Sequence, residues 1–335
     1  MITCALTGPS IFAEDLLPSI QLRTLGRAHL LSAAFLILAP AFAAAENVDN
    51  KDDSTFVDQG RMFRLDYAND YFTGTDRYYT QGIGLSYFDP VLRASPPMRI
   101  LPTLPEKRSY GVVLRQSGFT PTSLSHVDPI MGDRPYACYV FLGHILVSRD
   151  PGRGLTLTAE LDTGVIGPAA GGQWEQTGIH RLSHNALPQG WNYEIRNDAV
   201  LDYYARLDKS LAAARAADFG VFGDATLGTL YTNASAGVIG RVGAMDGKKH
   251  RFFLFADAEQ KVVAYDATLQ GGLFNRNSPY ALAAAQIERR ISREDVGVTL
   301  DRGSYALEAK RTYLSQEFTT GLSHEWVEIS FIKKF

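Results

Sequence analysis

The chain has 335 residues, a formal net charge of -3 and 45% hydrophobic residues. This near balance of charge lacks the basic excess that nucleic-acid binding requires, so no nucleic acid is expected as a partner. Its two cysteines are Cys4 and Cys138. Because Cys4 falls in a segment expected to be removed, we predict neither an internal disulfide in the mature chain nor a structural zinc site.

Residues 1–45 have the pattern of an N-terminal extension followed by a secretory signal peptide. Arg23 and Arg27 precede an apolar run over residues 30–39, and mostly small residues follow over 41–45. A membrane-spanning helix needs about 20 apolar residues, so the run is too short for that alternative. We therefore predict export of the chain, with residues 46–335 forming one domain.

Alternation of apolar and polar residues dominates the rest of the chain. It is regular from Leu155 to Asp162 and continues over a longer stretch from Asn192 to Asp208. A long strand with one charged and one apolar face suits a closed barrel in lipid, whose polar face lines the lumen. A soluble sandwich or lipocalin-like barrel is the alternative. The final strand ends on Phe335, which resembles the assembly signal of bacterial outer-membrane barrels and favours the membrane barrel.

The predicted fold class is therefore all-β, a transmembrane antiparallel up-and-down β-barrel of about 12 strands, of the bacterial outer-membrane type. The strands are expected at 59–68, 80–88, 108–117, 135–148, 154–166, 192–208, 216–228, 233–245, 250–265, 284–300, 302–314 and 319–335. With both ends periplasmic, the short turns fall on the periplasmic side. The Pro-rich connection from Asp89 to Lys107 is longer than such turns usually are. Barrel assembly machinery, acting through Phe335, and outer-membrane lipid are the implied partners.

The same parity places three polar segments at the extracellular rim, namely 71–79, 118–132 and 166–191. Asp70 shares a strand face with the charged residues Arg64 and Asp66, and is expected to face the lumen. Thr80 shares a face with Gly82 on the next strand. Asp70 and Thr80 are thus predicted to point inward at one rim, close enough to share a metal ion or a substrate carbonyl.

Four motifs occur in order along residues 58–210: Asn69-Asp70 with Gly74-Thr75-Asp76-Arg77-x-Tyr79-Thr80, then Asp133-Arg134-Pro135-Tyr136-Ala137, then Gly167-Pro168-Ala169-Ala170 with Gln176-x-x-x-His180, and finally Gly190-Trp191. Each motif alone is modest, but the ordered set is specific. Together they resemble the outer-membrane lipid A 3'-O-deacylases of the LpxR type.

The resemblance implies a twelve-stranded, calcium-dependent enzyme that hydrolyses the ester holding the 3'-linked acyloxyacyl chains of lipid A in lipopolysaccharide. It implies that His180 is the general base, that Asp70 is a Ca²⁺ ligand, and that Asn69, Thr80 and Gln176 orient the base, water or substrate. The active site is then expected to face the cell surface from the outer membrane.

The chain departs from the family pattern at four positions. The family usually has Thr-Asn-Gly where this chain has Gln81 after Thr80, and glycine in place of Cys138. It has Gln and Glu where this chain has Glu194 and Asp198. None of these departures touches the expected base, but Glu194 adds a negative charge and bears on substrate preference.

The chemistry agrees with these roles, because ester hydrolysis needs a base near neutral pKa and an electrophile for the developing oxyanion. Calcium prefers oxygen ligands such as the Asp70 carboxylate. These residues also have simpler possible roles. Asn69 and Asp70 can serve only to form the turn, and His180 can be a solvated or hydrogen-bonded histidine. Arg134 is expected to pair with Asp133 at the rim, or to bind substrate through a lipid A phosphate.

Two other functions remain open from the sequence. One is a non-catalytic outer-membrane barrel, either a channel or a structural protein that binds lipopolysaccharide. The other is an outer-membrane phospholipase, although the chain has no Gly-x-Ser-x-Gly elbow for a serine nucleophile of the α/β-hydrolase type.

Overall fold

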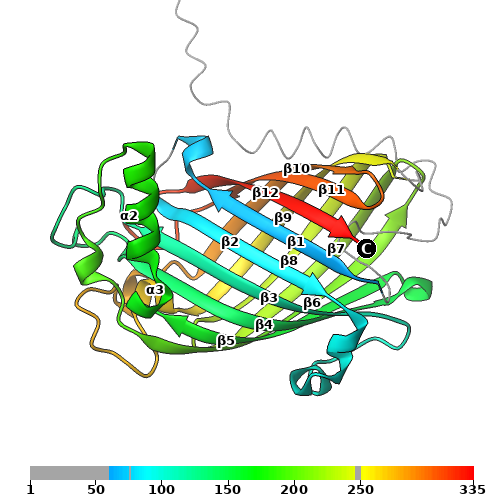
Figure 1. Ribbon diagram of the computed structural model, residues 1–335, viewed down its shortest axis with the longest axis horizontal. Coiled ribbons are helices and arrows are strands. Elements are labelled where there is room, and N and C mark those ends of the chain that lie inside the picture. The colour runs from blue at the N-terminus through cyan, green and yellow to red at the C-terminus, as the bar shows by residue number, and fades with distance from the viewer. Residues whose placement is uncertain (1–59, 75–76, 246–249) are drawn as a thin grey trace, which may run out of the picture.

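The computed structural model describes residues 60–74, 77–245 and 250–335, and they form a closed barrel of twelve antiparallel strands (Figure 1). The strands are β1 (Met62–Asn69), β2 (Tyr78–Phe88), β3 (Lys107–Thr120), β4 (Ala137–Asp150), β5 (Leu155–Ile166), β6 (Asp198–Ala213), β7 (Ala217–Gly228), β8 (Tyr231–Ala244), β9 (Arg251–Asp266), β10 (Arg290–Asp301), β11 (Tyr305–Leu314) and β12 (His324–Lys334). The predicted all-β barrel of about 12 strands is confirmed. The predicted signal peptide lies outside the described residues.

Every strand pairs with its neighbours in sequence, and β1 closes the barrel by pairing with β12. Met62 lies opposite Phe88 on β2 and opposite Lys334 on β12. Closure leaves no free sheet edge, so every strand pairs with a neighbour on both sides.

No helix within the described ranges is long and apolar enough to cross a membrane.

Three strands begin five or six residues later than their alternation predicts. Strand β6 starts at Asp198 rather than at residue 192, because residues 191–193 form a short 3-10 helix, η6 (Trp191–Tyr193), and the buried Ile195 donates its N–H to the Tyr136 carbonyl. Strand β10 starts at Arg290 after η7 (Ala284–Gln286), and β12 starts at His324. The alternation of apolar and polar residues thus continues beyond the strands into loop segments. These segments bury apolar side chains, although they do not pair as strands.

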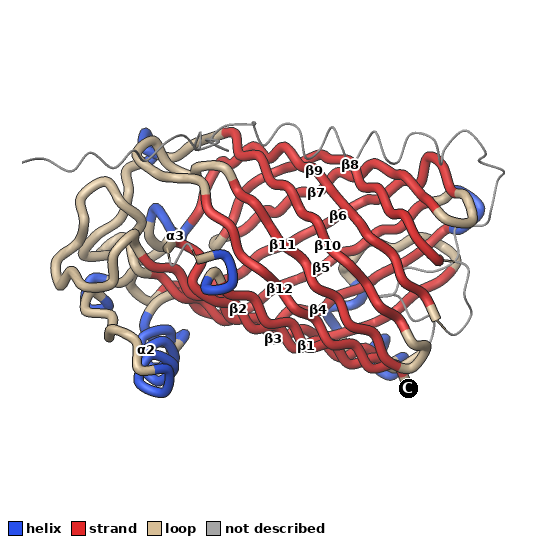
Figure 2. The backbone as a smooth tube through the Cα atoms, turned by 90° about the horizontal axis from the view of Figure 1, so that it is seen from above, coloured by secondary structure: helices blue, strands red, loops and turns tan. Residues whose placement is uncertain are grey.

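Loops and helices gather mainly at one end of the barrel (Figure 2). That end carries α2 (Gly172–Ser183), α3 (Ala267–Gln270), η1 (Tyr71–Thr73), η5 (Pro168–Ala170), η6 and η7. The opposite end carries the C-terminus, η2 (Pro90–Ala94), η3 (Pro96–Arg99) and η4 (Pro151–Arg153). The long connection between β2 and β3 is folded onto this end, since Met98 and Leu101 pack against Leu146.

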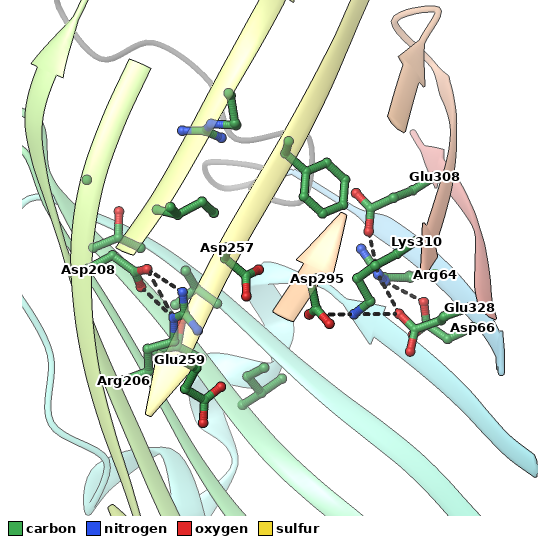
Figure 3. Close-up of a pocket in the computed structure, with 18 of the residues that line it drawn as sticks. Arg64, Asp66, Arg206, Asp208, Asp257, Glu259, Asp295, Glu308, Lys310 and Glu328 are labelled. Atoms are coloured by element: carbon green, nitrogen blue, oxygen red, sulfur yellow. Dashed lines mark hydrogen bonds and ion pairs between the residues drawn. The ribbon is translucent and has the colours of Figure 1, made fainter. Parts of the chain in front are cut away.

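The lumen holds a cavity of about 670 Å³ with charged walls (Figure 3). Its lining includes Arg64 and Asp66, as predicted from the face they share, together with Gly82. Opposite charges pair across and along the strands, with Arg206 2.8 Å from Asp208. These pairs neutralise the wall, so the lumen presents no strong field of one sign.

Aromatic side chains fill the lumen at the end that carries α2. Tyr79 lies 5.5 Å from Phe119 and 4.7 Å from Trp326, measured between ring centroids. Phe119 continues the contact to Tyr139 at 6.1 Å. The Arg134 guanidinium lies over the Phe119 ring at 4.3 Å. This packed layer separates the loops at this end from the charged cavity below.

Phe335 follows β12 at the opposite end. Its N–H donates to the Arg61 carbonyl, and the residue is 72% exposed. Its part in barrel assembly stays a prediction.

Candidate functional site

Helix α2 lies outside the barrel wall, across the ends of β2, β3 and β4 (Figures 1 and 2). Gly172 allows this close approach, because a Cβ there would meet the Cβ of Cys138 at 2.5 Å and the Trp191 ring at 2.7 Å. Glu175, one turn along, interacts with Gln81 and Gln116 on the outer face of the wall. The candidate site is therefore a junction between a helix and the outside of the barrel.

Thr80 faces this junction and not the lumen, so the predicted inward direction is wrong. The pairing of β2 with β3 shifts register between Tyr79 and Gln81, which makes Thr80 the extra residue of a β-bulge. Tyr79 takes the lumen side, and the Thr80 methyl lies near the outward face of Gly118. Alternation cannot reveal such a bulge, because every residue after it changes face.

Gln176 ties α2 to the wall and is buried. Its Nε2 donates to Thr80 Oγ1 at 3.3 Å, and its Oε1 accepts from Trp191 Nε1 at 2.8 Å. Trp191 was part of a sequence motif but was not predicted as a site residue. The pair of bonds fixes the amide orientation of Gln176, since the indole can only donate.

His180 lies one helical turn beyond Gln176, on the same side of α2. Its Nδ1 lies 2.6 Å from the carbonyl oxygen of Ala186. A carbonyl only accepts, so Nδ1 carries the proton and Nε2 of the neutral ring keeps a free lone pair. Helix α2 ends at Ser183, with His184 in the left-handed conformation, so the two histidines do not form a metal pair on one helix.

Asn69 and Asp70 end β1 and build the turn to β2. The Asn69 Oδ1 accepts from the Tyr71 N–H at 2.7 Å, and Asp70 Oδ2 accepts from the Arg77 N–H at 2.6 Å. Asp70 is buried and does not line the lumen cavity. The backbone is strained where this turn ends, because Tyr78 has a φ of 69°, in the left-handed region that non-glycine residues seldom adopt.

The carboxylates of Asp70 and of Glu175 on α2 both lie near Tyr67. The Tyr67 hydroxyl accepts from Asn69 Nδ2 at 3.2 Å. Asp70 and Glu175 both act electrostatically on this tyrosine. Burial raises the pKa of Glu175, against the opposing hydrogen bonds of Gln116 and Gln81, and its Oε2 is buried without a hydrogen-bond partner.

This oxygen-rich set fits a hard cation such as Ca²⁺, to which Asp70 and Glu175 would contribute charge. Within the part of the chain that the structure describes, no group of three or more His, Cys, Asp or Glu side chains is placed to hold a metal. A cation here would therefore depend on neutral oxygens as well as on these two carboxylates.

Arg134 is buried and tied to other loops at the same end. Its Nη1 pairs with Glu317 at 2.5 Å, and its Nη2 donates to Thr268 Oγ1 at 2.7 Å. The predicted ion pair with Asp133 is wrong, since the Asp133 carboxylate accepts from Thr122 and from the Arg134 N–H. With 1% of its surface exposed, Arg134 does not present its guanidinium to a lipid phosphate.

We expect Arg134→Ala to destabilise the barrel by about 3–5 kcal/mol, because it leaves the Glu317 carboxylate without its cation. Heat- and urea-dependent migration of the folded protein on gels measures this loss. The double variant Arg134→Met with Glu317→Leu is expected to recover much of the stability, since it removes both charges. A double variant as unstable as Arg134→Ala would contradict the role of the ion pair.

Glu194 follows η6 and acts electrostatically on Cys138, the residue that Gly172 of α2 approaches. It has 1% of its surface exposed, and its Oε1 has no hydrogen-bond partner. Burial raises its pKa to about 8, against a smaller effect of Arg196. The carboxyl is therefore neutral in the folded protein at pH 7, and in this state it matches the glutamine of the family pattern in shape.

Because the pKa of Glu194 is higher folded than unfolded, stability falls as pH rises from about 4.5 to about 8. We expect Glu194→Gln to remove this loss, so that its Tm exceeds that of the wild type at pH 8.5. At pH 4, below the unfolded pKa, the two Tm values are expected to coincide. Equal differences in Tm at both pH values would contradict the titration of Glu194.

Comparisons with known proteins give one family. The sequence profile described as outer membrane protein LpxR matches residues 30–335. The solved structure of LpxR from Salmonella typhimurium has a TM-score of 0.69 and 19% identity, and the match covers 82% of this chain and 100% of that one. No curated protein matches the chain.

More distant barrels match with lower scores. An outer-membrane channel from Pseudomonas putida F1 has a TM-score of 0.46 and 13% identity, covering 86% of this chain and 100% of that one. The β domain of the Bordetella autotransporter BrkA has a TM-score of 0.43 and 9% identity, covering 82% and 99%.

Proposed function

This chain belongs to the LpxR family of outer-membrane proteins, and we propose that it is a calcium-dependent hydrolase that removes the 3'-linked acyloxyacyl chains from lipid A in the outer leaflet. The observation that carries the proposal is His180 on a helix outside the wall, with its proton fixed on Nδ1. A base in this position reaches an ester that arrives from the surrounding lipid and not through the lumen.

His180 Nε2 accepts a proton from the attacking water as that water adds to the ester carbonyl. The Ala186 carbonyl holds the ring and favours the imidazolium that forms. The C-terminal end of α2 adds to this effect, because a helix C-terminus stabilises positive charge. The same imidazolium then returns the proton to the leaving alkoxide.

The residues around His180 position it and the ester. Thr80 and Gln176 hold α2 at a fixed place on the wall, and Asn69 fixes the turn that presents Asp70. Asp70, with Glu175, would hold Ca²⁺, which supplies positive charge for the developing oxyanion when it is bound. The site is proposed to face the cell surface.

The alternatives are less well supported. The aromatic layer around Tyr79 and Phe119 fills the lumen, and the wall charges below it are paired, which disfavours an open channel. A phospholipase shares the barrel and the cation, so it is distinguished by substrate and not by fold.

Mass spectrometry of lipid A tests the proposal. Cells that express the wild type are expected to yield lipid A lacking the 3'-linked chains, and cells that express His180→Ala are expected to yield intact lipid A. Identical acylation in both would reject the assigned chemistry. Hydrolysis of diacyl phospholipid but not lipid A by the purified protein would favour the phospholipase, and conductance without hydrolysis would favour the channel.

A further inference from the structure

Helix α2 has one face that packs on the barrel wall and another that nothing covers. Gln176 on the inner face is buried, whereas Trp174 and Leu182 are 83% and 85% exposed. Residues 174, 178 and 182 are four apart and share one side of the helix. A Cβ added at Gly178 would meet nothing within 4 Å, so the whole strip is open.

The neighbouring turn extends this apolar surface. In η1, Tyr71 and Phe72 are 73% and 54% exposed, and their rings contact each other edge to face at 6.1 Å. Glu175 of α2 and Asp70 before η1 both act electrostatically on Tyr67, so both elements lie near this tyrosine of the wall. We call Tyr71, Phe72, Trp174 and Leu182 the outer apolar face.

The outer apolar face continues the lipid-facing belt of the barrel. Below α2, the outward side chains of the strands are apolar and exposed, as at Leu85, Leu114 and Leu142. Directly under the helix they are polar, as at Gln81 and Gln116. The helix therefore lies where the apolar wall gives way to a polar rim, which is the position of a membrane interface.

From this continuity we propose that the outer apolar face is embedded in the acyl-chain region of the outer leaflet, so that α2 is an interfacial membrane helix. Trp and Leu on one side of such a helix enter the boundary between head groups and acyl chains. Arg181, exposed and seven residues after Trp174, lies beside this face and can keep its guanidinium at head-group level.

This placement gives α2 a second support. Gln176 anchors it to protein, and Trp174 with Leu182 anchors it to lipid, so the helix that carries His180 is held between the two. The inference rests on the outer-membrane location and not on hydrolysis. Its failure is therefore distinguishable from failure of the proposed function.

Tryptophan fluorescence tests the proposal in the full-length barrel. The chain has three tryptophans; Trp191 is buried, and Trp326 stacks on His324 within the barrel. In phosphatidylcholine vesicles with brominated acyl chains, the wild type is expected to lose more emission than Trp174→Phe. Acrylamide in the water is expected to quench the two proteins equally. Equal quenching by brominated chains, or stronger acrylamide quenching of the wild type, overturns the proposal.

A spin label gives an independent measurement that does not use Trp174. A nitroxide on Leu182→Cys is expected to be more accessible to oxygen than to a water-soluble nickel complex. The same label on Ser125→Cys, in an exposed part of the 121–136 connection at this end, is expected to show the reverse. Nickel accessibility at residue 182 equal to that at residue 125 overturns the proposal, and so does shielding from both reagents, which would indicate a second copy.

Discussion

Replacing His180 by alanine is expected to lower kcat for lipid A deacylation by about 10²- to 10⁴-fold, the usual contribution of a positioned general base. KM is expected to change little, because the lone pair on Nε2 acts on the attacking water and not on the bound acyl chains. Purified wild type and His180→Ala, assayed on lipid A in mixed micelles, give both constants.

His184 provides the matched control for this variant. It lies four residues from His180 in the same region, but it caps α2 in the left-handed conformation. Asparagine tolerates that conformation, so His184→Asn preserves the cap while it removes an imidazole. Activity near the wild-type level is expected. Equal losses in both variants would mean that the region tolerates no change, and an unchanged kcat in His180→Ala would remove the proposed base.

The barrel was predictable from sequence because the alternation of apolar and polar residues is a local pattern along each strand. Alternation alone placed Arg64 and Asp66 on the lumen wall, where the structure has them. It failed where the backbone breaks the period, at the bulge that turns Thr80 outward and at the 3-10 helix that begins at Trp191. Both failures lie beside α2, where irregular backbone positions the candidate site.

Partners distant in sequence were not predictable. Arg134 pairs with Glu317, 183 residues away, because the loops before β4 and before β12 meet at one end of the barrel. The place of Glu175 in the candidate site was not predictable for a related reason. Its contacts with Gln81 and Gln116 depend on α2 folding back over the outside of the wall, and a helix period gives no information on what a helix packs against.

Asp70→Asn is expected to weaken Ca²⁺ binding by about 10- to 100-fold, the range seen when the surroundings of a metal ligand are altered. Asparagine keeps the shape of the side chain and an oxygen that can accept the Arg77 N–H, so the turn is expected to persist. What changes is one negative charge, and Ca²⁺ affinity depends on the number of charged ligands.

Binding is measured without activity, as the Ca²⁺ concentration that raises the Tm of the purified protein. EDTA is expected to abolish deacylation by the wild type, and Ca²⁺ is expected to restore it.

Asp150→Asn is the matched control. Asp150 is also buried and also accepts a turn N–H, from Arg153 at 3.0 Å, but it lies at the opposite end of the barrel. An equal shift in Ca²⁺ response in both variants would show that the cation is not held at Asp70. An unchanged response in Asp70→Asn, with activity lost, would instead assign this carboxylate to the turn and to the placement of its neighbours.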